Sequence, residues 1–123
     1  YRTVTIADIP GLIEGAHRGI GLGHDFLRHI ERTRFLLFVI DMAGVDGRHP
    51  ADDYLGLRDE LQQYRTDLVA RPYAILANKM DLPGAEEHLR EFEKRCGEAP
   101  LPISADRTEG MDAVRALLSE KLP

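Results

Sequence analysis

Residues 73–81 read Tyr73-Ala74-Ile75-Leu76-Ala77-Asn78-Lys79-Met80-Asp81. The apolar first part has the length of one buried strand, and the polar part begins abruptly where that strand is expected to end. Arg71-Pro72 precedes the run, and Pro83-Gly84 turns the chain just beyond it. This pattern predicts a buried strand over residues 73–77 that delivers a polar loop to one edge of a sheet.

The same arrangement recurs on both sides of this stretch. Three further apolar runs end at polar residues: residues 3–7 before Asp8, residues 35–40 before Asp41, and residues 100–103 before Ser104. Run 35–40 does not alternate, and we therefore expect a strand that is buried on both faces. The sequence thus predicts four strands, each followed by polar residues.

Segments with helical spacing separate these strands. They are marked by Phe26, Leu27 and Ile30 within residues 24–33; by Tyr54, Leu57, Leu61, Tyr64 and Leu68, which continue toward the break at Arg71-Pro72; by Leu89, Phe92 and Cys96; and by Met111, Val114, Leu117, Leu118 and Leu122. Strands that alternate with helices predict an α/β fold with a parallel sheet and right-handed crossovers. No repeat or linker interrupts the pattern, so we expect a single domain over residues 1–123.

Composition excludes several classes of protein. The 123 residues are 43% hydrophobic and 30% charged, which is typical of a globular domain and argues against disorder. No run approaches 18 apolar residues, so we expect no membrane span. The net charge of −5 argues against general adhesion to nucleic acid. Cys96 is the one cysteine and has no disulfide partner within the chain.

The polar residues at the strand ends are the candidates for function, because parallel sheets bind ligands at the carboxyl ends of their strands. Asp8-Ile9-Pro10-Gly11 suits the γ-phosphate end of a nucleotide site. The Asp8 carboxylate can hold Mg²⁺ through a water, because Mg²⁺ keeps much of its hydration shell. Gly11 lets a backbone N–H approach a phosphate with no Cβ in the way.

Asn78-Lys79-Met80-Asp81 suits the base of a guanine nucleotide. A carboxylate at Asp81 can accept two hydrogen bonds from the N1–H and N2–H₂ edge of guanine, and adenine offers no matching pair of donors. The Lys79 stem can lie along the base plane, and Asn78 can tie neighbouring loops together. The alternative is a capping Asp81 beside a surface Lys79.

The last strand end adds Ser104, Ala105 and Asp106, where a backbone N–H can reach guanine O6. Taken in order, the strand ends at Asp8, Asn78 and Ser104 follow the G3, G4 and G5 motifs of Ras-like GTPases. The fourth strand end, Asp41, matches none of these motifs.

The chain resembles the Obg family of GTPases. The likeness is carried by residues 8–17 and 21–33, which are similar to that family's switch II signature, and is dense over residues 3–41 and 73–84. The resemblance implies a P-loop NTPase, Ras-like three-layer α/β/α sheet of order 2-3-1-4-5-6. It also implies GTP and GDP as ligands, Mg²⁺ as cofactor, and the large ribosomal subunit or its rRNA as partner. By the same resemblance, the parent protein hydrolyses GTP during large-subunit assembly in the bacterial cytoplasm, or else in a mitochondrion or plastid.

The chain also departs from that family. P-loop GTPases need Gly-x-x-x-x-Gly-Lys-[Ser/Thr], and none of the three lysines, Lys79, Lys94 and Lys121, lies in that context. We therefore expect an incomplete G domain, from the switch II motif to the last helix, that binds GTP poorly and does not turn it over by itself. Leu12 replaces the glutamine that orients water in Ras-like enzymes, so no catalytic residue is assigned. The alternative is a non-catalytic module that binds protein or RNA.

Other candidates have plainer explanations. His17, His24 and His29 cluster, but no pair has the i, i+4 spacing of a helical metal site. Arg28, Arg32 and Arg34 can form an RNA-facing patch or an ordinary solvated face. The five glycines within residues 11–23 suit a switch loop that reorders around a γ-phosphate, or a flexible surface loop. We expect Cys96 to pack in the core, and Ser104 lacks the partners of a nucleophile.

Overall fold

The computed structural model describes Ile6 and residues 32–44, 47–64 and 66–122. Within that part of the chain, strands and helices alternate in the order β1 (Leu36–Asp41), α2 (Pro50–Tyr64), β2 (Tyr73–Asn78), α3 (Ala85–Cys96), β3 (Leu101–Pro102) and α4 (Met111–Lys121). The strand predicted over residues 3–7 and the helix predicted over residues 24–33 lie outside the described residues, apart from Ile6 and residues 32–33.

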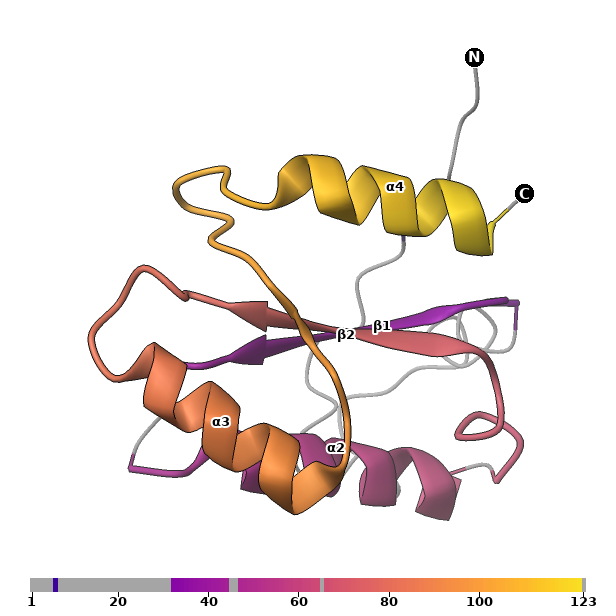
Figure 1. Ribbon diagram of the computed structural model, residues 1–123. Coiled ribbons are helices and arrows are strands. Elements are labelled where there is room, and N and C mark those ends of the chain that lie inside the picture. The colour runs from indigo at the N-terminus through magenta and orange to yellow at the C-terminus, as the bar shows by residue number, and fades with distance from the viewer. Residues whose placement is uncertain (1–5, 7–31, 45–46, 65, 123) are drawn as a thin grey trace.

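The three strands form one parallel sheet in the order β1-β2-β3. β1 and β2 pair along their full length, from Leu36 opposite Tyr73 to Asp41 opposite Asn78. β3 is shorter than predicted and pairs with β2 through Leu101 and Pro102. α2 and α3 cover one face of the sheet, and α4 lies on the other (Figure 1). This arrangement confirms the predicted α/β class and the three layers.

The sequence explains where the helices begin and end. Pro50 opens α2, where its missing N–H costs nothing. The imidazole Nδ1 of His49 accepts the N–H of Ala51 at 3.0 Å, and so caps one of the free donors of that first turn. α3 ends at Cys96, and the next residue, Gly97, adopts a φ of 66° and donates its N–H to Glu93 O at 2.9 Å. Glycine tolerates this left-handed conformation best.

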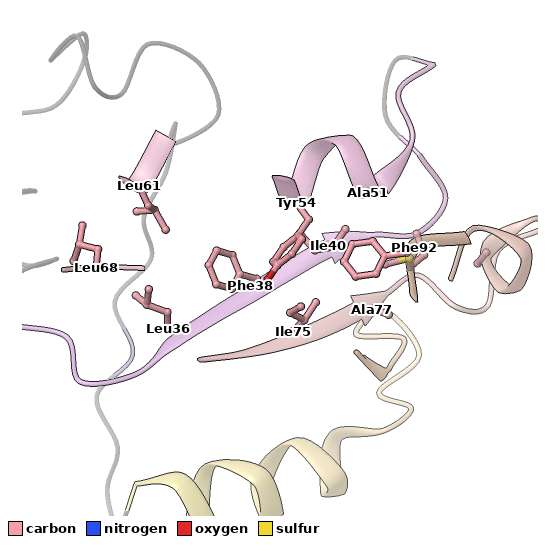
Figure 2. Close-up of a cluster of buried hydrophobic side chains, with 12 residues drawn as sticks. Leu36, Phe38, Ile40, Ala51, Tyr54, Leu61, Leu68, Ile75, Ala77 and Phe92 are labelled. Atoms are coloured by element: carbon pink, nitrogen blue, oxygen red, sulfur yellow. The ribbon is translucent and has the colours of Figure 1, made fainter. Parts of the chain in front are cut away.

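The hydrophobic core lies between the sheet and the two helices α2 and α3. Figure 2 shows its central side chains, which come from β1, β2, α2, α3 and the turn after α2: Leu36, Phe38, Ile40, Ala51, Tyr54, Leu61, Leu68, Ile75, Ala77 and Phe92. The rings of Phe38 and Tyr54 meet edge to face, with centroids 5.3 Å apart. Tyr54 lies at the same distance from Phe92 of α3. The aromatic contacts therefore join β1, α2 and α3.

Two expectations from the sequence are wrong in detail. β1 buries Leu36, Phe38 and Ile40, but Val39 on its opposite face is 54% exposed, so the strand is not buried on both faces. α4 lies instead over β2, where Ala113, Ala116 and Leu117 face a groove along Tyr73–Ile75, and no residue of α4 is buried. A continuous apolar run therefore does not reveal that one of its side chains, Val39, is exposed.

The second difference concerns the end of α2. The apolar stripe predicted a helix that reaches Leu68, whereas α2 ends at Tyr64 and Leu68 lies in a turn. Leu68 is nevertheless fully buried. Its carbonyl accepts the backbone N–H of Arg71 at 3.2 Å. The guanidinium of Arg71 donates to the carbonyl of Thr33 at 3.0 Å. The turn thus inserts Leu68 into the core and leads directly into β2.

A pair of glycine substitutions tests the packing beside β3. Gly110 and Gly97 both have positive φ, but a Cβ on Gly110 would lie 2.9 Å from Ile103 Cγ2 and 3.0 Å from the Pro102 carbonyl, whereas a Cβ on Gly97 meets nothing within 4 Å. Both alanine variants carry the cost of a left-handed residue, about 1–2 kcal/mol. We expect Gly110→Ala to cost about 1–3 kcal/mol more, because only that variant overpacks. Urea unfolding measures the difference, and equal losses would contradict the packing assigned to Gly110.

Candidate functional site

The polar loop after β2 is a tight turn held against the segment that follows β3. Lys79 adopts a φ of 65°, which is uncommon for a residue other than glycine. The carbonyl of Lys79 accepts the N–H of Leu82 at 3.0 Å, and the N–H of Met80 donates to Ile103 O at 3.1 Å. The Met80 side chain packs against the hydrophobic core. These contacts leave Asn78, Lys79 and Asp81 at the carboxyl edge of the sheet.

Asp81 is an ionised carboxylate fixed by a buried hydroxyl. Ser104 is 1% exposed, and its Oγ donates to Asp81 Oδ1 at 2.7 Å. The guanidinium Nε of Arg107 lies 3.6 Å from Oδ2. The hydrogen bond from Ser104 and the charges of Arg107 and Lys79 lower the pKa of Asp81 below its ordinary 3.8, although partial burial opposes them. Asp81 therefore accepts hydrogen bonds at neutral pH and donates none.

The loop after β3 is held by its own backbone. Ser104 N donates to Glu109 O at 3.0 Å, and Glu109 N donates back to Ser104 O at 2.9 Å. Gly110 follows this bridge with its φ of 82°. The N–H of Ile103 donates to Ala77 O at 2.8 Å. This hydrogen bond and the closed loop together place the Ser104 hydroxyl opposite Asp81.

Asn78 joins the two loops, as its side chain was expected to do. Its Oδ1 accepts the N–H of Ala105 at 3.0 Å. The sequence predicts that a backbone N–H of this loop reaches guanine O6, and the N–H of Ala105 is one candidate. In this structure that N–H already donates to Asn78 Oδ1. A purine at this site would share that donor with Asn78, or take the place of Asn78 as its acceptor.

Lys79 makes its closest charged contact with the neighbouring strand end. Its Nζ lies 2.7 Å from Asp41 Oδ2. The Asp41 carboxylate raises the pKa of the Lys79 ammonium above its ordinary 10.5, mainly through this hydrogen bond. Asp41 therefore belongs to the same cluster as the loop after β2.

The structure describes the later group of residues selected from the sequence and brings them to one edge of the sheet. This group comprises Asn78, Lys79, Met80, Asp81, Ser104, Ala105 and the exposed Asp106. The earlier group, which comprises Asp8, Ile9, Pro10, Gly11 and Leu12, lies outside the described residues, as do His17, His24, His29 and Arg28. Arg32 and Arg34 are described, and both are exposed.

Sequence reasoning missed Arg107 and gave Asp41 no role. No spacing rule connects Arg107 to Asp81, which lies 26 positions earlier, and the pairing depends on the closed loop after β3. For Asp41, its place at a strand end was the available signal. Cys96 is partly buried against the core as expected, and burial raises the pKa of its thiol above 9.0.

The part of the chain that the structure describes contains neither a cluster of metal ligands nor a membrane-spanning helix. There, no group of three or more His, Cys, Asp or Glu side chains is placed to hold a metal ion. The magnesium expected from the sequence rests on Asp8, which lies outside the described residues. None of the helices described has the length and apolar character needed to cross a membrane.

Comparison with known proteins yields one family. A family model described as 50S ribosome-binding GTPase matches residues 1–79. The chain is 57% identical over 119 residues to a GTPase Obg of Geobacillus thermodenitrificans, a match that covers 95% of this chain and 27% of that protein. It is 53% identical over 121 residues to a GTPase Obg of Bacillus cereus, covering 97% of this chain and 28% of that protein. The chain therefore spans little more than a quarter of the length of these relatives.

Removing the Ser104 hydroxyl tests how Asp81 is held. The native pKa of Asp81 is lowered, so its hydrogen bond stabilises the fold fully above pH 3.8, and this stabilisation is lost as pH falls through the lower native value. We expect Ser104→Ala to reduce the free energy of unfolding at pH 7 and the deficit to shrink below pH 3.8. Urea unfolding from pH 2.5 to 7 measures it. In an Asp81→Asn background the same substitution should lose this pH dependence, and a deficit that is constant with pH would contradict the assignment.

Proposed function

The chain belongs to the 50S ribosome-binding GTPase family, and we propose that its strand-end cluster binds the guanine base of GTP and GDP. The relatives named GTPase Obg support the same ligand class. On this proposal Asp81 accepts the N1–H and N2–H₂ donors of guanine, Lys79 lies along the base, and the loop of Ser104, Ala105 and Asp106 borders O6.

The observation that carries the proposal is the setting of Asp81. Its carboxylate is held by the buried Ser104 hydroxyl through Oδ1, and its lowered pKa keeps it charged. A carboxylate has about four lone-pair sites, so the contacts with Ser104 and Arg107 leave acceptor capacity for a base. Adenine presents no pair of donors on that edge, and an acceptor fixed in place therefore favours guanine. The plainer alternative, a capping Asp81 beside a surface Lys79, does not require a buried serine hydroxyl that donates to the carboxylate.

The phosphate end of the proposed site rests on residues that the structure does not describe. A carboxylate and a glycine, Asp8 and Gly11, are chemically suited to a water-held Mg²⁺ and to a close backbone approach. Bound Mg²⁺ would neutralise charge on the β- and γ-phosphates. Leu12 can neither donate nor accept a hydrogen bond, so the side chain at this position does not orient the attacking water.

We propose further that the whole protein hydrolyses GTP to GDP and acts with the large ribosomal subunit during its assembly, in the bacterial cytoplasm. The name of the matching family supports the ribosomal part, since it refers to the 50S subunit. The two relatives compared above come from bacteria, which supports the location. We also propose that residues 1–123 form a single, partial G domain of the Obg type.

Exchange of Asp81 for asparagine tests the base-binding role. The asparagine amide presents one acceptor and one donor toward the base, so its N–H would face one of the two guanine donors. It matches xanthine, the base of xanthosine diphosphate (XDP), which carries a carbonyl at C2. We expect Asp81→Asn to weaken GDP binding by about tenfold to a hundredfold, the loss of a charged hydrogen bond, and to improve XDP binding. Competition of GDP, XDP and ADP against fluorescent GDP measures this in the longest form of the protein that contains these residues.

The matched control is Asp112→Asn, because that side chain is 98% exposed on α4 and pairs only locally with Arg115. It should leave all three affinities unchanged. If the unaltered protein binds GDP and ADP equally well, the proposed function is wrong.

A second measurement separates binding from turnover. These 123 residues hold no Gly-x-x-x-x-Gly-Lys-[Ser/Thr] sequence, so we expect the isolated 123-residue polypeptide to show no single-turnover GTP hydrolysis above background. The longest form of the protein, assayed in parallel in the presence of Mg²⁺, should hydrolyse GTP. Hydrolysis by the isolated polypeptide would show that the phosphates are held without that lysine. Its absence from both forms would favour the alternative of a non-catalytic binding module.

A further inference from the structure

Asp41 ends β1 directly beside the guanine-binding loop. It pairs in register with Asn78, and the N–H of the next residue, Met42, donates to Asn78 O at 3.0 Å. The Asp41 side chain is 22% exposed. The residue is therefore rigidly placed by the sheet, although it belongs to none of the nucleotide motifs.

Both oxygens of the Asp41 carboxylate are engaged. Oδ1 accepts the N–H of Ala43 at 2.9 Å, which fixes the side chain within the turn that follows β1. Oδ2 is thereby turned toward the next strand end, where it accepts the Lys79 ammonium at 2.7 Å. One oxygen sets the orientation of the carboxylate, and the other holds the lysine.

Lys79 has two carboxylates within its surroundings, Asp41 and Asp81, and both raise the pKa of its ammonium. Its hydrogen bond goes to Asp41, while Asp81 is held by Ser104 and approached by Arg107. The Lys79 side chain is 48% exposed, so without a fixed partner its four rotatable bonds would leave the ammonium mobile. An unheld ammonium would also be free to pair with Asp81 and to occupy the oxygens that a base needs.

We propose that Asp41 is a positioning residue of the nucleotide site: it holds the Lys79 ammonium away from Asp81, so that the lysine stem lies ready along the base and the Asp81 carboxylate stays open to guanine. This inference rests on the proposed guanine-nucleotide function. It extends that function to a residue on a different strand, which acts only through Lys79.

Three substitutions separate the two tasks of Asp41. Asp41→Asn keeps an oxygen for the Ala43 N–H but removes the charge that holds Lys79, and Asp41→Ala removes both contacts. In the longest form of the protein, we expect Asp41→Asn to weaken GDP binding about threefold to tenfold, the cost of ordering one long side chain on binding. In a Lys79→Gln background, Asp41→Asn should have no further effect, because the ion pair is already gone.

A second readout reports the ion pair without any nucleotide. The chain has three lysines, Lys79, Lys94 and Lys121. Loss of the Asp41 charge lowers the pKa of Lys79, so in Asp41→Asn the Lys79 amine should be acetylated faster at pH 9 while the rates at Lys94 and Lys121 stay the same. Mass spectrometry of the modified peptides gives the three rates in one sample.

The outcomes are distinguishable. If the unaltered protein binds no GDP, the proposed function fails and this inference fails with it. If GDP binds but Asp41→Asn weakens it equally with and without Lys79, Asp41 is a structural residue and the inference alone is overturned. Equal losses in Asp41→Asn and Asp41→Ala, absent in the Lys79→Gln background, together with faster acetylation of Lys79, support it.

Discussion

The parallel pairing of β1 with β2 is the constraint on which the rest of the described structure depends. Its register sets Asp41 opposite Asn78, so two polar strand ends come side by side at one edge. A slip of one residue would turn Phe38 and Ile40 away from α2 and would also separate Asp41 from Lys79. Because the same register serves both the buried face and the polar edge, the core and the site are not independent features of this chain.

A cluster of polar contacts around Glu98 joins the sheet to α2. The hydroxyls of Tyr54 on α2 and Tyr73 on β2 both donate to Glu98 Oε2 at 2.5 Å, and the Arg58 guanidinium lies 4.8 Å from the centre of the Tyr73 ring. Burial and the bond to Glu98 raise the pKa of Tyr54 well above its ordinary value, so it remains a donor. Since Glu98 lies just before β3, one carboxylate joins a helix, the central strand and the approach to the third strand.

The sequence predicts those features that depend on neighbouring residues. The apolar runs at 35–40 and 73–77 place β1 and β2 to within one residue. The polar residues Asn78, Lys79 and Asp81 lie at the carboxyl end of β2, as the sequence predicts. It does not predict features that depend on distant residues. The exposure of Val39 depends on which helix covers that face of the sheet. The burial of Leu68 depends on a turn that replaces the last part of the predicted helix. The pairing of Arg107 with Asp81 depends on a loop that Ser104 and Glu109 close. Periodicity carries no information about such partners.

The placement of Ser104 beside Asp81 depends on loop closure as well as on strand pairing. β3 supplies two paired residues, and Ile103 continues the contact by donating to Ala77 O and accepting from the N–H of Met80. The Ser104–Glu109 bridge, the left-handed Gly110 packed on Ile103, and the Asn78 oxygen on the Ala105 N–H provide the remaining restraint. Asp41, at the end of β1, restrains the Lys79 ammonium through their ion pair. In the proposed guanine site, Ser104 thus holds Asp81 and Asp41 holds Lys79, so a change at the end of β1 or β3 would alter the geometry that a base meets.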